Sequence, residues 1–435
     1  MANGKKWARL YVGMQTLILG IPNLELRFSN IDTQLRDSIM NILMLSSTFP
    51  YPPTQGGTQV RTFHLLNYLN QFHSVTLLTQ RSDDVSDADI KALREFVSEL
   101  VVFDRPAACD RSKAARFARF LISGTPPSVQ SSYSPEMQTW IDRTIEKFDV
   151  VTCEHSVNEI YIRPAWPIRR VVNVHSSVFK SCQNQLQAKT SENLWRDRVN
   201  LPLLKRYEQR YCKKFTHVVV TTDDDRQAFQ SLDPTARIEV IPNGVDLAEF
   251  PNRSHDPNNH QLVFIGAMDN LANIDAARFL SLKILPALQQ HYPDASLMLV
   301  GARPTAEIQQ LGDRPGVTVT GKVPAMIPYL YAATVCVIPM QIGYGIKNKT
   351  LEAMAAGIPV VASDRGLEGL AVDGENTPLR ALRANTVEQY VAAISQLFEN
   401  ATLRSRLSQN ARDLIQTDYT WERAGHQYLR VLAGN

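Results

Sequence analysis

The sequence predicts an α/β protein made of two facing, Rossmann-like domains, each a doubly wound parallel sheet, with a cleft between them. The length of 435 residues is too great for one compact core and fits two domains of ordinary size. From Met40 onward, short β-branched runs alternate with segments of helical spacing, which is the pattern of a parallel sheet covered by helices. A polar stretch rich in proline and asparagine, residues 251–260, interrupts this pattern, which then restarts.

The first predicted domain covers residues 40–255. It opens with NILMLSS, a run of the buried-strand type, and a loop rich in proline and glycine follows. Further strands are predicted at residues 74–80, 100–104, 149–154, 169–177 and 217–222, and helices at 58–72, 87–100 and 203–215.

The second predicted domain covers residues 256–415, and residues 416–435 form a last helix expected to pack back towards the first domain. Two such domains leave a cleft at the C-terminal ends of their strands, where folds of this kind bind ligands. Strands are predicted at residues 261–268, 295–301, 317–323, 335–340 and 358–363, and helices at 273–290, 305–311, 326–333 and 348–357.

Residues 1–39 are predicted to be an N-terminal extension, because MNILMLSSTFP, which begins at Met40, is typical of the first strand of a domain. An extra helix packed on the domain and a membrane anchor are the alternatives. The start of the chain resembles a signal peptide, but Gln15 interrupts its apolar stretch and no small-residue cleavage pattern follows. No apolar run reaches the roughly 18–20 residues that a membrane span needs.

The composition fits a globular cytoplasmic protein, with 44% hydrophobic and 20% charged residues. The net charge of +3 gives no reason to expect nucleic acid as a partner. The number of cysteines is odd, their spacing is long and no C-x-x-C occurs, which favours free thiols in a reducing compartment over disulfides or a zinc site. They are Cys109, Cys153, Cys182, Cys212 and Cys336.

Residues 343–352 have the composition of a phosphate-binding loop that enters a helix. Its two glycines let the backbone approach a phosphate, and its two lysines supply cations. Asn348 or Thr350 is expected to cap the helix, and Glu352 lies where its carboxylate can accept hydrogen bonds from two ribose hydroxyls. The alternative is an ordinary glycine-containing loop with solvated lysines. The predicted binding residues are Gly343, Tyr344, Gly345, Ile346, Lys347, Asn348, Lys349 and Glu352.

The segment PMQIGYGIKNKTLEAMAAGIPVVAS, residues 339–363, resembles the signature of the family-4 retaining glycosyltransferases of GT-B fold. Its variant resembles that of bacterial exopolysaccharide-associated sugar transferases. The resemblance runs from Met40 almost to the C-terminus and includes the motifs IPNGVD and LVFIGAMDNLANIDAARFL. It implies a nucleotide-diphosphate-sugar donor in the second domain and a saccharide or lipid-linked acceptor in the first. It also implies net retention, no metal or other cofactor, and a role in cell-surface polysaccharide or glycolipid synthesis.

The resemblance gives Glu352 the ribose and the loop before it the diphosphate, but two departures stand out. The family often pairs two glutamates separated by seven residues, and the first of these falls on Tyr344. Many members also carry an arginine and a lysine after the first strand of the second domain, where this chain has GAMDNLANIDA. Arg303, Lys347 and Lys349 are the nearest substitutes for these cations.

In the first domain, the resemblance places Gly56 and Gly57 near the donor phosphate or the acceptor; a plain tight turn is the alternative. His155 and His175 each end a predicted strand and are candidates for contact with the sugar or acceptor, although a lone histidine is often structural. These two histidines and Lys347 are the candidate catalytic residues. Retaining enzymes of this kind need no evident nucleophile, because a phosphate oxygen of the leaving group can take the acceptor proton.

Two further segments have open interpretations. Asn243, Gly244 and Asp246 in IPNGVD either organise the cleft floor and hinge or form a structural turn. Residues 110–124 read as a basic amphipathic helix, which either rests peripherally on an anionic membrane or is an ordinary helix with a charged outer face.

Three other functions compete with sugar transfer. A nucleotide-sugar epimerase of the same fold is one alternative, and a non-catalytic nucleotide-sugar binder is another. A Rossmann dehydrogenase is disfavoured, because no G-x-G-x-x-G follows the first strand.

Overall fold

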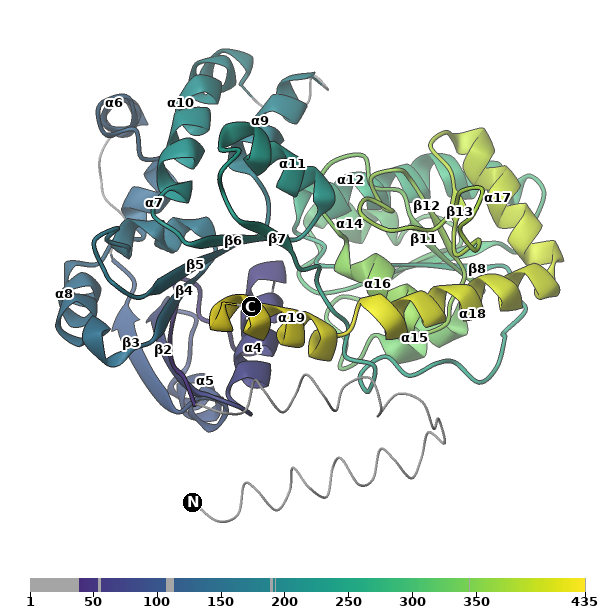
Figure 1. Cartoon of the computed structure of the whole chain (residues 1–435). Helices are drawn as coiled ribbons and strands as arrows, with labels where there is room; N and C mark the ends of the chain where they lie inside the picture. The colour runs from purple at the N-terminus through teal and green to yellow at the C-terminus, as the bar shows by residue number, and fades with distance from the viewer. Residues whose placement is uncertain are drawn as a thin grey trace. The chain divides into compact units, whose positions relative to one another are not determined.

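The computed structural model describes residues 39–53, 56–106, 113–187, 191, 193–343 and 345–434. The predicted extension at residues 1–39 lies outside this part except for Ile39, and so does Tyr344. Residues 41–435 form one compact unit, in which two parallel sheets are each covered by helices (Figure 1). The prediction of two doubly wound parallel-sheet domains is confirmed.

The first sheet has seven strands in the order β3-β2-β1-β4-β5-β6-β7. Neighbouring strands in it pair in parallel, as in β1 with β4, where Ile42 lies opposite Val150. The strands are β1 Asn41–Ser46, β2 Ser74–Arg81, β3 Glu99–Asp104, β4 Val150–Glu154, β5 Arg169–Val174, β6 His217–Val220 and β7 Ile238–Val240. The helices are α4 Gly57–Leu69, α5 Asp87–Leu93, α6 Lys113–Ser123, α7 Pro127–Ser131, α8 Pro135–Thr144, α9 Val178–Gln187, α10 Leu194–Cys212 and α11 Asp223–Leu232, with short 3₁₀ turns at Arg94–Phe96, Ile145–Lys147 and Ser156–Tyr161.

The second sheet has six strands in the order β10-β9-β8-β11-β12-β13, again paired in parallel. The strands are β8 Gln261–Ile265, β9 Ser296–Val300, β10 Val317–Val319, β11 Val335–Ile338, β12 Val360–Ala362 and β13 Leu382–Arg383. The helices are α12 Leu271–Phe279, α13 Leu285–Gln289, α14 Ala306–Leu311, α15 Ile327–Ala332, α16 Asn348–Ala355, α17 Val387–Glu399, α18 Ala401–Asp418 and α19 Trp421–Ala433, and a π-helical segment, Leu280–Ile284, joins α12 to α13.

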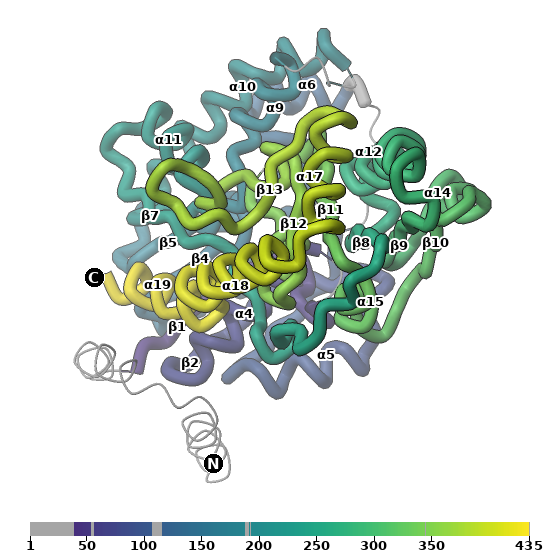
Figure 2. The backbone as a smooth tube through the Cα atoms, turned by 90° about the vertical axis from the view of Figure 1, so that its right-hand side faces the viewer, coloured from purple at the N-terminus to yellow at the C-terminus, as the bar shows by residue number. Residues whose placement is uncertain are grey.

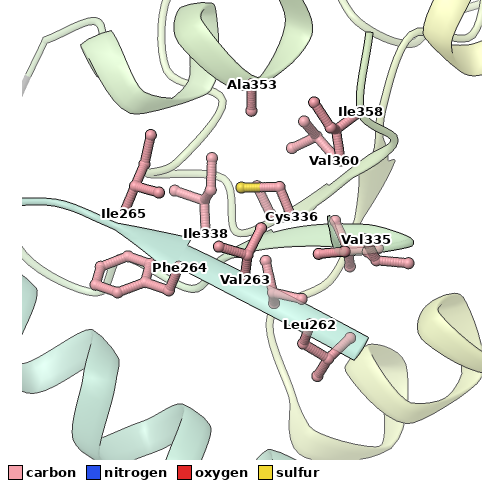
Figure 3. Close-up of a cluster of buried hydrophobic side chains, with 14 of the residues drawn as sticks. Leu262, Val263, Phe264, Ile265, Val335, Cys336, Ile338, Ala353, Ile358 and Val360 are labelled. Atoms are coloured by element: carbon pink, nitrogen blue, oxygen red, sulfur yellow. The ribbon is translucent and has the colours of Figure 1, made fainter. Parts of the chain in front are cut away.

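Continuous apolar runs in the strands produce a buried core on both faces of each sheet. Figure 3 shows this core in the second domain, where Ile265 of β8 and Ile338 of β11 lie on the side of the sheet that faces Ala353 of α16. Ala353 and Ala355 of α16 are fully buried, and their small size allows the helix to lie close to the sheet. The start of α16 is therefore held firmly against β11 and β8.

Strand order reverses between β1 and β4 in the first sheet and between β8 and β11 in the second. At such a switch point, the loops leaving two neighbouring strands diverge and open a crevice at their carboxyl ends. The loop from β11 into α16 is residues 339–347, which places the segment singled out from sequence at the switch point of the second sheet.

The chain crosses between the two sheets at two segments that lie side by side. Val245 forms a parallel bridge with Thr420, and its N–H donates to the Tyr419 carbonyl at 2.8 Å. A Cβ at Gly244 would lie 2.4 Å from the Trp421 nitrogen, so only glycine fits this crossing. Beyond it, α19 packs on α4, and Figure 2 shows α18 and α19 leading from the second sheet to the first.

One predicted helix is too long. Residues 87–100 were expected to be helical, but α5 ends at Leu93 and a 3₁₀ turn ends at Phe96. Glu99 already pairs with Thr76 of β2, and strand pairing therefore outweighs the helical spacing of these residues. The four described cysteines are buried and free, and Cys109 lies outside the described residues.

Candidate active site

The loop from β11 to α16 owes its shape to two glycines. Gly343 has a φ of +91° and Gly345 a φ of +77°, in the left-handed region that other residues rarely adopt. A Cβ at Gly345 would lie 3.8 Å from Thr221 Oγ1 and 3.9 Å from the His175 carbonyl oxygen. The loop of the second domain therefore lies directly against the ends of β5 and β6 of the first.

The N-terminus of α16 has no side-chain cap. Its N-cap residue is Lys347, which makes no capping hydrogen bond. The expectation that Asn348 or Thr350 caps the helix is wrong: Asn348 Oδ1 accepts from Asn243 Nδ2 at 3.0 Å, and Thr350 Oγ1 donates to the Gly366 carbonyl at 2.8 Å. Both polar side chains are used in tertiary contacts, and this leaves the first backbone N–H groups of α16 available to an anion.

Lys349 reaches from α16 to the end of β8. Its ammonium donates to Asn273 Oδ1 and lies 4.7 Å from the centre of the Phe264 ring. A Cβ at Gly266, directly after β8, would lie 3.0 Å from Lys349 Nζ. The cation missing from the β8–α12 turn in the sequence is thus replaced in space by a lysine from another element.

Lys349 and Glu352 are one turn apart on α16 and interact electrostatically. Burial lowers the pKa of Lys349 to about 8, and the Glu352 carboxylate opposes this shift. Burial also raises the pKa of Glu352 to about 7, against the attraction of Lys349. The carboxyl group makes none of the hydrogen bonds found among the described residues, so its acceptor positions are available.

Lys347 points to the opposite side of the loop. Its ammonium donates to the Gly345 carbonyl and lies 3.5 Å from Glu368 Oε2. The same Glu368 oxygen lies 3.5 Å from Arg365 Nη1, and burial lowers the pKa of Lys347. The two predicted lysines therefore have different environments, and Lys347 is tied to a carboxylate that Lys349 does not contact.

Arg303 follows β9 and has a positive φ of +54°. Its guanidinium forms a two-point ion pair with Asp269 of the β8–α12 loop, with N–O distances of 2.5 and 3.2 Å. Both side chains are about half exposed, at 50% and 42%. The arginine stands at the carboxyl edge of the second sheet, where the sequence placed it.

The glycine pair of the first domain lies at the start of α4. Gly56 is the N-cap, with an extended φ of −173°, and Gly57 is the first helical residue. Among the described residues, a Cβ at Gly57 would meet no atom within 4 Å, and one at Gly56 would meet Gln59 Oε1 at 4.0 Å. The packing of these residues does not require glycine at the start of α4, and they leave space beside it.

The two candidate histidines form a pair. The His155 and His175 rings are 5.3 Å apart and nearly perpendicular, at 71°. His175 Nδ1 lies 3.2 Å from Thr58 Oγ1 in the first turn of α4, while its buried Nε2 has no hydrogen-bond partner among the residues that the structure describes. His155 has a φ of 80°, a costly conformation for a residue with a Cβ. Burial lowers the pKa of both rings, so both are neutral at pH 7.

The structure also contains a buried hydrogen-bond chain that the sequence did not reveal. Tyr428 of α19 donates to Glu154 Oε1 at 2.6 Å, and Asn173 Nδ2 donates to Glu154 Oε2 at 2.8 Å. Arg61, fully buried in α4, donates to Asn173 at 3.0 Å and to Asn243 Oδ1 at 3.0 Å. Asn243 then donates to Asn348 at the start of α16.

This chain of hydrogen bonds joins α19, the first sheet and α16. The sequence singled out Asn243, but it gave no sign that an arginine on a helix would be buried, because burial depends on partners distant in sequence. The one sequence feature that could have pointed to a role for Arg61 is its position in the helix that follows Gly56 and Gly57.

Among residues 39–434 with their undescribed gaps, no three His, Cys, Asp or Glu side chains come together as a metal site. Every helix in the described ranges is too short or too polar to span a bilayer.

Family models match most of the chain. Residues 55–249 match the model described as Glycosyltransferase Family 4, and residues 259–400 match the one described as Glycosyl transferases group 1. The boundary between the two matches falls in the linker between β7 and β8.

Curated relatives show similarity over shorter segments. The chain is 29% identical over 119 residues to an uncharacterized glycosyltransferase of Methanocaldococcus jannaschii, covering 27% of this chain and 30% of that protein. It is 24% identical over 248 residues to spore coat protein SA of Bacillus subtilis, covering 50% of this chain and 65% of that protein. The matched segments span less than two thirds of either relative.

Solved structures match over nearly the whole chain. HepE of Anabaena in complex with UDP-glucose is 15% identical, with a TM-score of 0.62, and the match covers 91% of this chain and 100% of that one. TarM of S. aureus in complex with fondaparinux, α-GlcNAc-glycerol and UDP is 11% identical, with a TM-score of 0.65 and the same coverage of 91% and 100%. At these identities the similarity is one of fold.

Proposed function

The chain belongs to the family-4 glycosyltransferases and has their GT-B fold, and on this premise we propose that it transfers a sugar from a nucleotide-diphosphate-sugar to a saccharide or lipid-linked acceptor. One observation carries the proposal. The glycine loop that leads to Lys349 and Glu352 lies within van der Waals reach of His175 and Thr221, so donor-type and acceptor-type elements meet at one place.

Each side of this site has a role in the proposal. The N-terminus of α16 and the Lys349 ammonium stabilise the diphosphate as charge develops on it. Glu352, with no hydrogen-bond partner among the described residues, accepts hydrogen bonds from the ribose hydroxyls. The neutral His175 uses its unpartnered Nε2 to hydrogen-bond a hydroxyl of the transferred sugar or acceptor.

The proposed reaction proceeds with retention and without a metal ion. The acceptor hydroxyl attacks the anomeric carbon from the face that the leaving diphosphate vacates, and a phosphate oxygen takes its proton. A C–O bond forms to the acceptor as the C–O bond to the diphosphate breaks, so no protein nucleophile is required. Lys347 and Arg303 are held by carboxylates at the edges of the site and serve as secondary donor contacts.

The test begins with UDP, because HepE was solved with it, and extends to GDP, ADP and dTDP. We expect one of these nucleotides to raise the melting temperature in EDTA, and the Glu352→Gln variant to lose most of this rise. Glu136→Gln, a change of an exposed glutamate in the first turn of α8, is the matched control. If no nucleotide raises the melting temperature of the wild type, the proposed donor site is wrong.

Turnover separates the possible activities. The sugar donor of the nucleotide that binds should be hydrolysed slowly in EDTA, and the released sugar should keep its anomeric configuration, as read by NMR. Inversion, or dependence on added Mg²⁺, contradicts the proposed mechanism. Conversion of the donor into an epimer assigns the epimerase instead, and binding without turnover assigns a non-catalytic binder.

The proposal includes peripheral contact with an anionic membrane at the cytoplasmic face. The first three residues of the predicted helix, 110–112, lie outside the description, but α6 exposes Leu121 at 48% and Ile122 at 88%. Arg210 of α10 donates to the carbonyls of Ser123 and Gly124, which fixes the end of α6 on α10.

The start of α10 presents a second exposed apolar group. Trp195 is 78% exposed and Val199 45%, and Arg196 and Arg198 lie between them in the sequence. Apolar side chains flanked by arginines favour the surface of a membrane that carries anionic lipid.

Vesicle sedimentation tests this contact. With vesicles of phosphatidylglycerol and phosphatidylcholine, we expect binding at low salt that weakens at high salt and is reduced by Ile122→Ser or Trp195→Ser. Leu282→Ser, at an exposed leucine of the second domain, should bind like the wild type. Equal sedimentation of all variants excludes this surface.

A further inference from the structure

A cavity borders the donor loop, and neither Lys349 nor Glu352 is among the residues that line it. It has a volume of about 390 Å³ and is formed at the carboxyl ends of β11 and β12. Gln341 of the donor loop, Ser363 after β12 and Tyr390 of α17 line it, and Asp224 at the start of α11 borders it from the first domain. Its size is within the range of small-molecule sites, roughly 300–1,000 Å³.

The charged groups around this cavity are arranged in ion pairs. The carboxylates of Asp224, Asp364 and Glu368 line it together with the guanidinium of Arg365. Lys347 and Arg365 pair with Glu368, and Arg383 pairs with Asp364, so these cations are engaged by carboxylates and are not offered to a diphosphate. A neutral ligand rich in hydroxyl groups would instead find carboxylate and amide acceptors for its O–H donors.

The Asp364 carboxylate is held in place before any ligand arrives. Arg383 Nη1 donates to its Oδ1 at 2.7 Å, and Asn385 Nδ2 donates to its Oδ2 at 3.1 Å. Asn385 Oδ1 in turn accepts from the Asp364 N–H at 3.1 Å, which closes a ring. The hydrogen bond to Arg383 holds the pKa of Asp364 below its usual value, so the carboxylate is ionised and preorganised.

The floor of the cavity contains a buried hydroxyl without a partner. Tyr390 is 1% exposed, and its hydroxyl forms no hydrogen bond within the described residues that meets ordinary geometry. The Ser363 hydroxyl next to it already donates to the Met340 carbonyl at 2.6 Å and accepts the Gly366 N–H at 3.0 Å. A buried unpaired hydroxyl costs free energy, which a ligand with a suitable acceptor would recover.

Two aromatic rings complete the floor. The Phe279 and Tyr390 rings meet at 80° with centroids 6.0 Å apart, and both line the cavity. Aromatic faces next to polar acceptors match the two kinds of surface of a pyranose, whose C–H face is apolar and whose rim carries hydroxyl groups.

We propose that this cavity binds a neutral hexopyranose unit of the acceptor saccharide. The inference rests on the proposed sugar transfer and assigns it an acceptor subsite on the second domain. Gln341 connects the cavity to the donor loop two residues before Gly343, so a saccharide held here borders the transferred sugar. Glu368 connects it to the same loop through Lys347.

Saturation-transfer NMR on the full chain tests the subsite, with glucose, galactose, mannose, N-acetylglucosamine, maltose, cellobiose and lactose as probes. We expect at least one to bind the wild type, and Asp364→Asn to bind it at least fivefold more weakly. Tyr390→Phe should weaken binding about threefold while its melting temperature stays equal or rises, because it removes a hydroxyl that makes no hydrogen bond of ordinary geometry among the described residues. A merely structural tyrosine would not combine these two results.

The matched control is Asp313→Asn, a change of an exposed aspartate, which should bind like the wild type. Binding of none of the seven probes overturns the subsite, as does equal binding by Tyr390→Phe and the wild type. The UDP-induced melting shift should persist in Tyr390→Phe. If no nucleotide raises the melting temperature but a sugar binds, the proposed donor site is wrong and the proposed saccharide subsite is retained. If a nucleotide raises the melting temperature but no sugar binds, only the saccharide subsite is wrong.

Discussion

The two sides of the cleft differ in the charge of their buried side chains. On the donor side, Lys349 and Glu352 are buried charged groups whose pKa values are drawn together, to about 8 and about 7. On the acceptor side, His155 and His175 are kept neutral by burial. The proposed donor side therefore suits an anion, while the proposed acceptor side suits hydroxyl groups. Changes on the two sides should consequently affect different kinetic constants.

The largest effect is expected at Lys349. Lys349→Met removes the ammonium that stands beside Gly266 and should lower kcat/KM about 100-fold, since one lost donor to a developing anion costs about 2.7–4 kcal/mol. Donor affinity, measured by calorimetry with UDP, should fall in parallel. Lys322→Met, a change of an exposed lysine in the same domain, is the control. Unchanged affinity in Lys349→Met would transfer the diphosphate role to Lys347.

The pH dependence of the donor side follows from Lys349. Anion binding needs the protonated amine, so UDP affinity should fall about tenfold per pH unit above roughly pH 8. The free protein should do the opposite. Its lysine pKa is depressed, so between pH 8 and 10.5 the unfolded state binds more protons and stability rises with pH.

Both trends should vanish in Lys349→Met. Titration calorimetry and thermal melts between pH 7 and 10 measure them together. Parallel loss of affinity and stability with rising pH would show that another group controls the alkaline limb.

On the acceptor side, His175→Leu should lower kcat about tenfold with little change in UDP affinity. The substitution removes the one neutral hydrogen bond that Nε2 is proposed to make with a substrate hydroxyl. His175→Gln should recover part of kcat, since its amide can reach a similar position. The exposed His291 offers a control substitution to leucine. A fall in UDP affinity equal to that of Lys349→Met would remove the distinction between the two sides.

A smaller effect is expected from Asn243, which connects the two sides. Asn243→Ala breaks the hydrogen bonds to Arg61 and Asn348 but touches neither substrate, so the donor KM should rise roughly twofold to tenfold. The double variant with Asn348→Ala should be no worse than the more affected single variant, because the two changes remove one shared bond. Additive losses would mean that the two asparagines act independently.

The sequence predicted the two-sheet architecture because its strands are continuous apolar runs whose burial needs no knowledge of distant partners. Gly343 and Gly345, which the sequence singled out, adopt positive φ angles, a local property that favours glycine, and their approach to a phosphate stays a prediction. The prediction that Asn348 or Thr350 caps α16 was wrong. These side chains instead form tertiary hydrogen bonds, Asn348 with Asn243 and Thr350 with Gly366.

Side-chain direction was the other limit. Lys347 and Lys349 are equivalent in the sequence pattern, but their side chains point to opposite sides. Lys347 contacts Glu368, and Lys349 contacts Asn273. The pairing of His155 with His175 depended on two strands becoming neighbours, which the sequence order does not state. These features follow from the assembled fold and not from spacing.

The smallest effect is expected at Arg303, which tests whether the donor side extends to the edge of the sheet. Its ion pair with Asp269 is half exposed and therefore worth little, so the guanidinium can turn to a phosphate at small cost. Asp269→Asn should leave the melting temperature within about 1 °C and raise UDP affinity about twofold by freeing Arg303, whereas Arg303→Gln should lower it about twofold to fivefold. Calorimetry at low and high salt measures both, and the gain in Asp269→Asn should disappear at high salt. If both variants bind UDP like the wild type, the donor side ends at Lys349, and the strained backbone of Arg303 serves only the pairing with Asp269.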